Sequence, residues 1–240
     1  INKKKYGRFI LFSSDFGYNS IKIINDRLEV VKKSEWQSLR NEYSVRKKIS
    51  YEIFKEFNKF LELLKKYDEI EDAPLIIVRP HPAEDINAWY EFSKRVSNIK
   101  VIYEGEISPW INASSGVLHR GCSAAIQAHM RGLPIGHFVS ENAKVDETPY
   151  KISKHLFTLH DVIEFCKTSV QNKNSNPIKY HDQFNKMIYI KENELASELI
   201  IKDLSNLDTN LEDNCDKSFI NILIDLKIYI KAYIKKILKL

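Results

Sequence analysis

Three short clusters of the chain carry side chains that bind anions or transfer protons. They occupy residues 13–17 (Ser-Ser-Asp-Phe-Gly), 79–82 (Arg-Pro-His-Pro) and 119–123 (His-Arg-Gly-Cys-Ser). A guanidinium can hold two phosphate oxygens at once, and an imidazole can give a hydrogen bond or a proton to a leaving group. The combination predicts a site that holds a phosphate.

The third cluster stands where a strand passes into a helix. Residues 117–118 are an apolar strand end, and an alanine-rich helix begins near Cys122 or Ser123 and stops at Gly132. The first turn of a helix has N–H groups without intrahelical partners, and these attract an anion. The alternative is a glycine turn followed by a serine cap, because a single glycine is a much weaker signal than a glycine-rich fingerprint.

The second cluster is stiffened by its two prolines. Each proline pushes the residue before it into an extended conformation, so Arg79 and His81 project to the same side. A stiff loop with solvated side chains is the alternative. We favour a binding role, since a rigid frame at the end of a strand has little other purpose.

The elements that would position these clusters alternate between strand and helix. We expect strands at 8–12, 75–78, 99–103, 116–118 and 133–139. Helical segments are expected at 21–70, 87–96, 108–111 and 160–167. This alternation predicts an α/β fold with a Rossmann-like parallel sheet flanked by helices. Ligands of such sheets bind at the carboxyl ends of the strands, where all three clusters and the pair Glu104-Gly105 fall.

The composition describes an ordinary globular protein. The chain has 240 residues, of which 43% are hydrophobic and 29% charged, and its net charge is +5. That charge is too small and too scattered to predict nucleic-acid binding.

Three cysteines without a C-x-x-C pair indicate a reducing compartment. Because no signal peptide or long uncharged run is visible, we expect a cytoplasmic protein. The chain starts at Ile1 rather than Met, which is compatible with a piece of a longer protein.

The third cluster also contains side chains that could bind a metal or act as a nucleophile. His119 and Cys122 alone cannot complete a metal ligand set, so we expect no metal. A thiol near a helix start can have a lowered pKa and act as a nucleophile, but a small buried cysteine is the commoner case. We expect His129 and His137 to be structural.

The sequence pattern of the C-terminal part differs from that of the rest of the chain. We expect a Rossmann-like domain over residues 1–170 and a helical extension over 171–240, with 141–150 as a polar loop. Residues 218–240 place an apolar stripe opposite a row of lysines, the pattern of a helix lying in a membrane interface. The alternative is a terminal helix packed on a domain or a partner.

The motifs together resemble a known family. The order is R-P-H-P at 79–82, E-G-x-x-x-P-W-I at 104–111 and H-x-G-C-S-A-A-I-x-A-x-x-x-G-x-P at 119–134. It resembles the bacterial surface carbohydrate biosynthesis proteins, which in turn resemble the C-terminal, donor-binding lobe of GT-B glycosyltransferases. The resemblance covers residues 8 to 140.

The resemblance implies a nucleotide-sugar donor, with CMP- or CDP-activated sugars favoured, and no further cofactor. It assigns the H-P pair at His81 and Pro82 to the departing phosphate, with His81 as the catalytic residue. Gln127 stands where many GT-B enzymes hold the ribose with a glutamate. The full set of candidate site residues is Ser14, Asp15, Gly17, Arg79, His81, Pro82, Glu104, Gly105, His119, Gly121, Cys122, Ser123 and Gln127.

The implied acceptor is a glycan or a lipid-linked sugar at the inner face of the cytoplasmic membrane. A GT-B enzyme also needs a second Rossmann-like lobe, and no second set of alternating strands is visible in this sequence, so it is expected to be only the donor-binding part. A CDP-polyol phosphotransferase or a nucleotide-sugar epimerase of the same architecture is an alternative. A non-catalytic module recruited to a membrane by its tail is another.

Overall fold

A computed structural model describes residues 3–139 and 148–171. The chain divides into two compact units, Ile1–Phe184 and Asn185–Leu240, and the second lies wholly outside the described residues. The predicted extension 171–240, apart from Gln171, and its terminal helix 218–240 therefore cannot be compared with the structure, nor can most of the loop at 141–150. None of the described helices has the length and apolar composition needed to span a bilayer.

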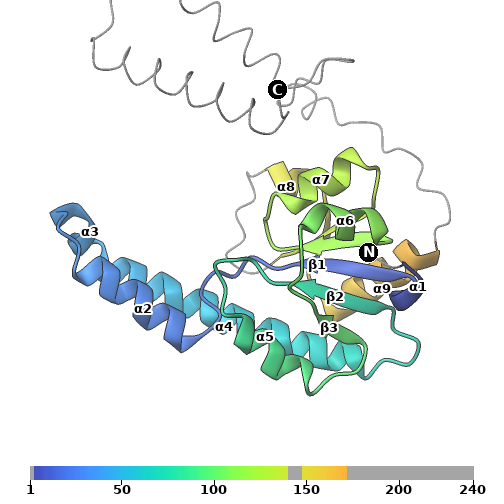
Figure 1. The fold of residues 1–240 in the computed structure, drawn as a ribbon, viewed down its shortest axis with the longest axis horizontal. Helices are drawn as coiled ribbons and strands as arrows, with labels where there is room; N and C mark the ends of the chain where they lie inside the picture. The colour runs from blue at the N-terminus through green and yellow to red at the C-terminus, as the bar shows by residue number, and fades with distance from the viewer. Residues whose placement is uncertain (1–2, 140–147, 172–240) are drawn as a thin grey trace, which may run out of the picture. The chain divides into compact units, whose positions relative to one another are not determined.

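The described part is built on one six-stranded sheet in which all strands run parallel (Figure 1). The strand order is β3-β2-β1-β4-β5-β6. The strands are β1 (Phe9–Ser13), β2 (Leu75–Arg79), β3 (Ile99–Val101), β4 (Gly116–His119), β5 (Ile135–Phe138) and β6 (Lys154–Leu156). This is the doubly wound order of Rossmann folds, in which the crossover direction reverses between β1 and β4. The expected parallel α/β sheet is confirmed.

Helices cover both faces of the sheet. They are α1 (Lys3–Tyr6), α2 (Ile21–Lys32), α3 (Gln37–Asn41), α4 (Tyr43–Asp68), α5 (Ile86–Ser93), α6 (Ile107–Ala113), α7 (Ala124–Met130), α8 (Thr148–Lys151) and α9 (Leu159–Gln171). Helices α4, α5 and α9 share one apolar core with the sheet, and α6 and α7 share the other.

Strand β1 shows why the sheet is buried on both sides. Its apolar residues are fully buried, as expected of a continuous apolar run in a central parallel strand. Alternate side chains enter opposite cores: Phe9 and Leu11 join α6 and α7, while Ile10 and Phe12 join α4, α5 and α9.

The expected helical stretch 21–70 is divided into three helices. Ser20 caps α2 by accepting from the N–H of Ile23, and α2 ends at Lys32. The second half of α4 is held on the sheet by Phe57, Phe60 and Leu64. Its first half, together with α2 and α3, extends away from the sheet as an arm (Figure 1).

Three elements were not predicted: α1, β6 and α8. Strand β6 has three residues, and only Leu156 of these is buried, so no apolar period marks it. It forms because Gly136, His137 and Phe138 of β5 offer it a parallel edge to pair with. Helix α8 is a single turn of four residues, too short to leave a periodic signal.

Candidate functional site

The carboxyl ends of the central strands bring three polar residues into one row. Ser13 of β1 lies in register with Arg79 of β2 on one side and with His119 of β4 on the other. Neighbours in register on parallel strands point to the same face, here the face that α6 and α7 cover. Residues far apart in sequence thus meet beside the point where the crossovers reverse, where ligands of such sheets bind.

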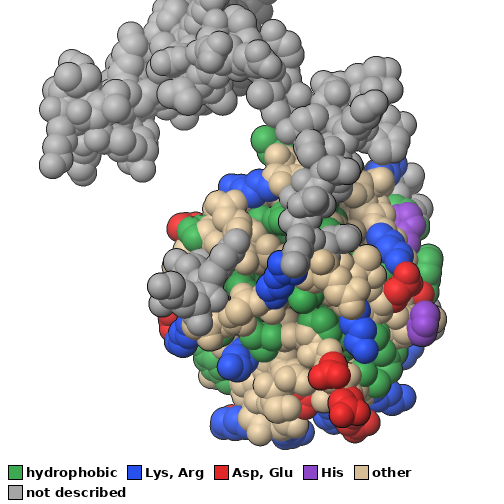
Figure 2. All heavy atoms as spheres, turned by 90° about the vertical axis from the view of Figure 1, so that its right-hand side faces the viewer, with side chains coloured by type: hydrophobic (Ala, Val, Ile, Leu, Met, Phe, Trp, Pro, Cys, Tyr) green, Lys and Arg blue, Asp and Glu red, His purple; other side chains and the backbone are tan. Residues whose placement is uncertain are grey.

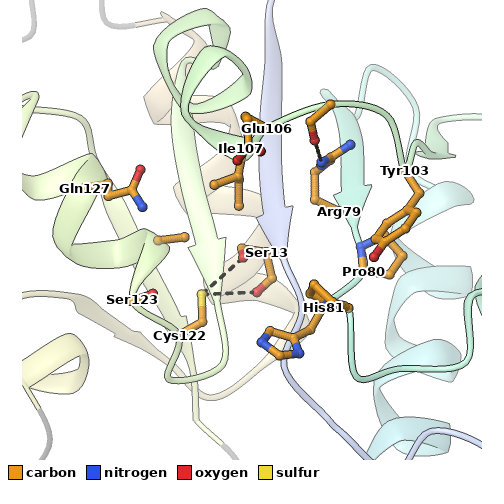
Figure 3. Close-up of a pocket in the computed structure, with 13 residues that line it drawn as sticks. Ser13, Arg79, Pro80, His81, Tyr103, Glu106, Ile107, Cys122, Ser123 and Gln127 are labelled. Atoms are coloured by element: carbon orange, nitrogen blue, oxygen red, sulfur yellow. Dashed lines mark hydrogen bonds between the residues drawn. The ribbon is translucent and has the colours of Figure 1, made fainter. Parts of the chain in front are cut away.

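A cavity of about 500 Å³ opens at this edge (Figure 3). Its wall combines the ends of β1 and β2, the loop after β3 and the start of α7. The lining residues are Ser13, Arg79, Pro80, His81, Pro82, Tyr103, Gly105, Glu106, Ile107, Cys122, Ser123, Ala124 and Gln127. Of the predicted site residues, the cavity gathers Arg79, His81, Pro82, Gly105, Cys122, Ser123 and Gln127.

Arg79 is the buried cation of the cavity wall, 7% exposed. Its Nη1 donates to the carbonyls of Ile102 (3.1 Å) and Glu104 (2.8 Å), and its Nη2 donates to that of Gly105 (2.6 Å). The guanidinium therefore holds the loop after β3 in place. A guanidinium has five N–H groups, so two remain, and the buried Nε has no hydrogen-bond partner in the structure.

Two aromatic rings flank this guanidinium. Its carbon lies 5.6 Å from the ring centre of Trp110 and 5.8 Å from that of Tyr103. Burial lowers the pKa of Arg79, while the neighbouring Tyr103 and Glu104 oppose that shift. An arginine keeps its charge under such a shift because its ordinary pKa lies far above neutral pH. The cavity wall thus carries a fixed positive charge.

His81 is exposed at the cavity and has a defined tautomer. Its Nδ1 accepts a hydrogen bond of 3.1 Å from the N–H of Ala83. In the neutral ring the proton is then on Nε2, which can donate to an anion. Figure 3 shows His81 and Gln127 on opposite sides of the cavity. Gln127 Oε1 accepts from Ser108 Oγ (2.9 Å), which leaves its NH₂ group to bind a ligand.

Cys122 is a buried thiol at the base of the cavity. Its Sγ lies 3.1 Å from Ser13 Oγ (Figure 3). Burial raises the pKa of the thiol, so the thiolate needed for nucleophilic attack is disfavoured. The environment fits the packing role rather than the nucleophilic one.

The helix that follows Cys122 begins at Ala124, one residue after the later of its two expected starts. Ser123 is the N-cap of α7, and its side chain makes no capping hydrogen bond, so the alternative of a serine side-chain cap is wrong. The helix ends at Met130, and Gly132 beyond it has φ +66°. The predicted end at this glycine is confirmed.

His119 lies behind the cavity rather than in it. It is fully buried, and its Nδ1 accepts from the N–H of Gly121 (2.9 Å). Its Nε2 lies 2.8 Å from Ser153 Oγ, whose own proton goes to the carbonyl of Pro149 (2.5 Å). His119 is therefore neutral, with its proton on Nε2. Burial, and then the adjacent His137, lower its pKa to about 3.

The remaining predicted residues also lie outside the cavity lining. Ser14 is buried and donates to Glu84, and the carbonyl of Asp15 accepts from Arg120 (3.2 Å). Gly17 has φ +71°, which favours glycine at that turn. Glu104 contributes its carbonyl, which accepts from Arg79 and Trp110. Gly121, with φ +95°, shapes the turn before α7. These residues shape the loops around the cavity.

Sequence reasoning missed the carboxylate that joins two of these loops. Glu84, 8% exposed, accepts from Ser14 Oγ, from the N–H of Phe16 (2.5 Å), from the N–H of His81 (3.4 Å) and from Trp89 Nε1 (2.8 Å). It ties the loop after β1 to the loop that carries His81. In sequence it is one of many glutamates, and only its position two residues after Pro82 could have drawn attention to it.

The cavity also includes Tyr103 and Glu106, which flank the predicted Glu104-Gly105 pair. Within residues 3–139 and 148–171, no group of three or more His, Cys, Asp or Glu side chains could hold a metal ion.

No protein-family model matches this chain, and no curated protein sequence does.

Proposed function

We propose that the cavity binds the phosphate-bearing part of a nucleotide-activated sugar, with CMP- or CDP-type donors favoured. The chain would then be the donor-binding part of a GT-B-type glycosyltransferase in bacterial surface polysaccharide biosynthesis. One observation carries the proposal: Arg79, His81 and the start of α7 line a single cavity at the carboxyl edge of a sheet ordered β3-β2-β1-β4-β5-β6. The motif resemblance at 79–82, 104–111 and 119–134 supports it.

The size and charge of the cavity support this choice of ligand. Pockets for small molecules and cofactors span roughly 300–1,000 Å³, and this cavity measures about 500 Å³. The fixed charge of Arg79 and the Nε2–H of His81 favour an anion. Glu106 is the carboxylate of the lining, and it would repel a phosphate but accept hydrogen bonds from hydroxyl groups. We therefore assign sugar hydroxyl groups to Glu106 and the phosphate to Arg79 and His81.

The proposed mechanism is stabilisation of the leaving group. As the bond between the anomeric carbon and the phosphate oxygen breaks, the phosphate keeps the bonding electrons and gains charge. The positive charge of Arg79 and a hydrogen bond from His81 Nε2 stabilise the negative charge that develops on the phosphate. Both groups are held in position before the reaction begins. An acceptor hydroxyl, from a glycan or a lipid-linked sugar, would form the new bond to carbon and lose its proton, which the departing phosphate can take up. The resemblance assigns that acceptor to a second lobe and the reaction to the inner face of the cytoplasmic membrane.

Calorimetric titration with CMP, CDP and UDP tests the proposal. We expect cytidine nucleotides to bind, and we expect His81→Ala to weaken that binding about tenfold, as loss of a charge-assisted hydrogen bond does. His160→Ala is the matched control because His160 is exposed on α9, away from the cavity. Absence of binding by all three nucleotides at millimolar concentration would refute the proposal. Turnover with candidate donors would separate transfer from the phosphotransferase and epimerase alternatives.

A further inference from the structure

The outer part of the arm, residues 29–49, has no buried side chain although every one of its residues is described. It comprises the end of α2, all of α3 and the start of α4. Large apolar side chains are nevertheless concentrated on it: Val30 and Trp36 are each 71% exposed, Val45 is 59% exposed and Ile49 is 50% exposed. Where exposed apolar side chains form a contiguous patch, they mark a site of interaction.

The same segment carries an excess of basic residues. Lys32, Lys33, Arg40, Arg46, Lys47 and Lys48 stand against Glu29, Glu35 and Glu42, a net charge of +3 out of the chain's +5. The three glutamates do not neutralise the basic residues, because Lys32 and Lys33 share Glu29 (3.7 and 3.3 Å). On the face of the described part that Figure 2 shows, opposite the arm, basic and acidic side chains both occur.

The arrangement of these groups suits a flat, anionic surface. Figure 1 shows α3 at the outer end of the arm, away from the sheet, and Trp36 immediately precedes that helix. Val45 and Ile49 are one turn apart on the same side of α4. An apolar groove of about 470 Å³ between α2 and α3 includes Val30, Val31 and Leu39. Tryptophan with aliphatic and basic neighbours is the composition that binds at the interface of a bilayer.

We propose that the tip of the arm docks on a membrane containing anionic lipid, with Trp36 entering the headgroup region. The excess positive charge favours this occupant over a second copy of the chain, because two identical tips would repel each other. Basic residues close to an anionic leaflet are attracted to it, and the interaction is limited to about a Debye length from the surface. This docking is independent of any nucleotide binding at the sheet edge.

Tryptophan fluorescence of the full chain reports on this tip selectively. The chain has three tryptophans, and the other two, Trp89 and Trp110, are buried at 0% and 6% exposure. Adding vesicles of phosphatidylcholine with phosphatidylglycerol is expected to shift the Trp36 emission to the blue, and brominated lipid is expected to quench it. Vesicles of phosphatidylcholine alone should do neither. Trp36→Gln should abolish both signals.

Charge reversal tests the electrostatic part. Lys47→Glu with Lys48→Glu should weaken vesicle binding by about 25-fold or more, since each of the two basic residues near an anionic surface contributes a factor of roughly five. Lys94→Glu with Lys100→Glu is the matched control, because both lysines are exposed and lie off the arm. It changes the net charge equally and should leave the Trp36 signal unchanged.

Three results would overturn the proposal. Vesicle binding without any change in Trp36 emission would place the contact elsewhere on the chain. A blue shift that grows with protein concentration in the absence of lipid would show that the tip binds a second copy. Blue-shifted emission protected from acrylamide in the dilute, lipid-free protein would show that another segment of the chain already covers Trp36.

Discussion

Trp89 Nε1 lies 2.8 Å from Glu84 Oε2, inside the protein. The same oxygen accepts from Ser14 and from the N–H of His81, and its partner oxygen accepts from the N–H of Phe16. A buried carboxylate surrounded by donors from two loops fixes their relative position. Asn19 joins the same loops a second time through both backbone groups of Asp85 (2.7 and 2.9 Å). His81 therefore reaches the cavity from a rigid frame.

We predict that Glu84→Ala destabilises the fold by at least about 3 kcal/mol, because each buried donor left without a partner costs roughly 1–3 kcal/mol. Glu84→Gln, which keeps one acceptor oxygen, should cost less. Urea denaturation measures both. Glu91→Ala is the control, since Glu91 is an exposed carboxylate on α5, seven residues along the chain, whose partner is Lys94. Equal stability of the Glu84→Ala and Glu91→Ala proteins would contradict the assigned role.

Replacement of Arg79 by lysine should damage both the loop and the cavity. A lysine ammonium cannot reproduce the fork that spans the carbonyls of residues 102, 104 and 105. We expect Arg79→Lys to lower the free energy of unfolding by about 2 kcal/mol through the lost charge-assisted hydrogen bonds. Thermal denaturation would detect the change, and Arg95→Lys at an exposed position should be neutral. A stable Arg79→Lys protein would mean that the loop does not depend on the fork.

We predict that protonation of His119 lowers the free energy of unfolding at acidic pH. Its pKa in the folded protein is lowered to about 3 by burial and by His137, against an ordinary value near 6.5. The unfolded chain therefore binds a proton first, so the stability contributed by neutral His119 is complete above pH 6.5 and is lost as the pH falls toward 3. The slope for one proton is about 1.4 kcal/mol per pH unit.

The measurement compares urea denaturation of the wild-type protein and of His119→Asn at several pH values between 7 and 4. Carboxylates contribute to both proteins, so the difference between the two slopes isolates His119. We expect the wild type to lose its stability advantage steadily below pH 6.5. His160→Ala should follow the wild type because His160 is exposed. Parallel curves for wild type and His119→Asn would show that His119 is not held neutral.

A side chain at Gly136 is predicted to crowd three apolar neighbours. A Cβ there would lie 2.7 Å from Leu156 Cδ1, 2.9 Å from Leu118 Cδ2 and 3.2 Å from Phe165 Cε1. We expect Gly136→Ala to cost about 1–3 kcal/mol through overpacking. In a double-mutant cycle, Leu156→Ala should relieve part of that cost because it removes the closest atom. Additive effects of the two changes would show that β5 can shift to make room.

Much of the fold could be predicted from the sequence. Apolar runs such as that at 8–12, separated by amphipathic helices, specify parallel strands because a buried strand must be apolar on both faces. The helix end at Gly132 followed from backbone chemistry that acts within a few residues. The cavity residues Arg79, His81 and Cys122 could be chosen because parallel strands all end at one edge.

Other features depended on contacts between distant residues. The sequence alone places Arg79 at a strand end, but only the tertiary structure shows that its guanidinium binds the loop at 102–105. Only the tertiary structure shows that His119 lies behind the cavity. Glu84 became central because its burial let four donors converge on it, and β6 exists because β5 offers an edge. Local pattern determines which segments are strand or helix. Register and burial decide which polar groups face a ligand, because they arise only when segments far apart in the chain pack together.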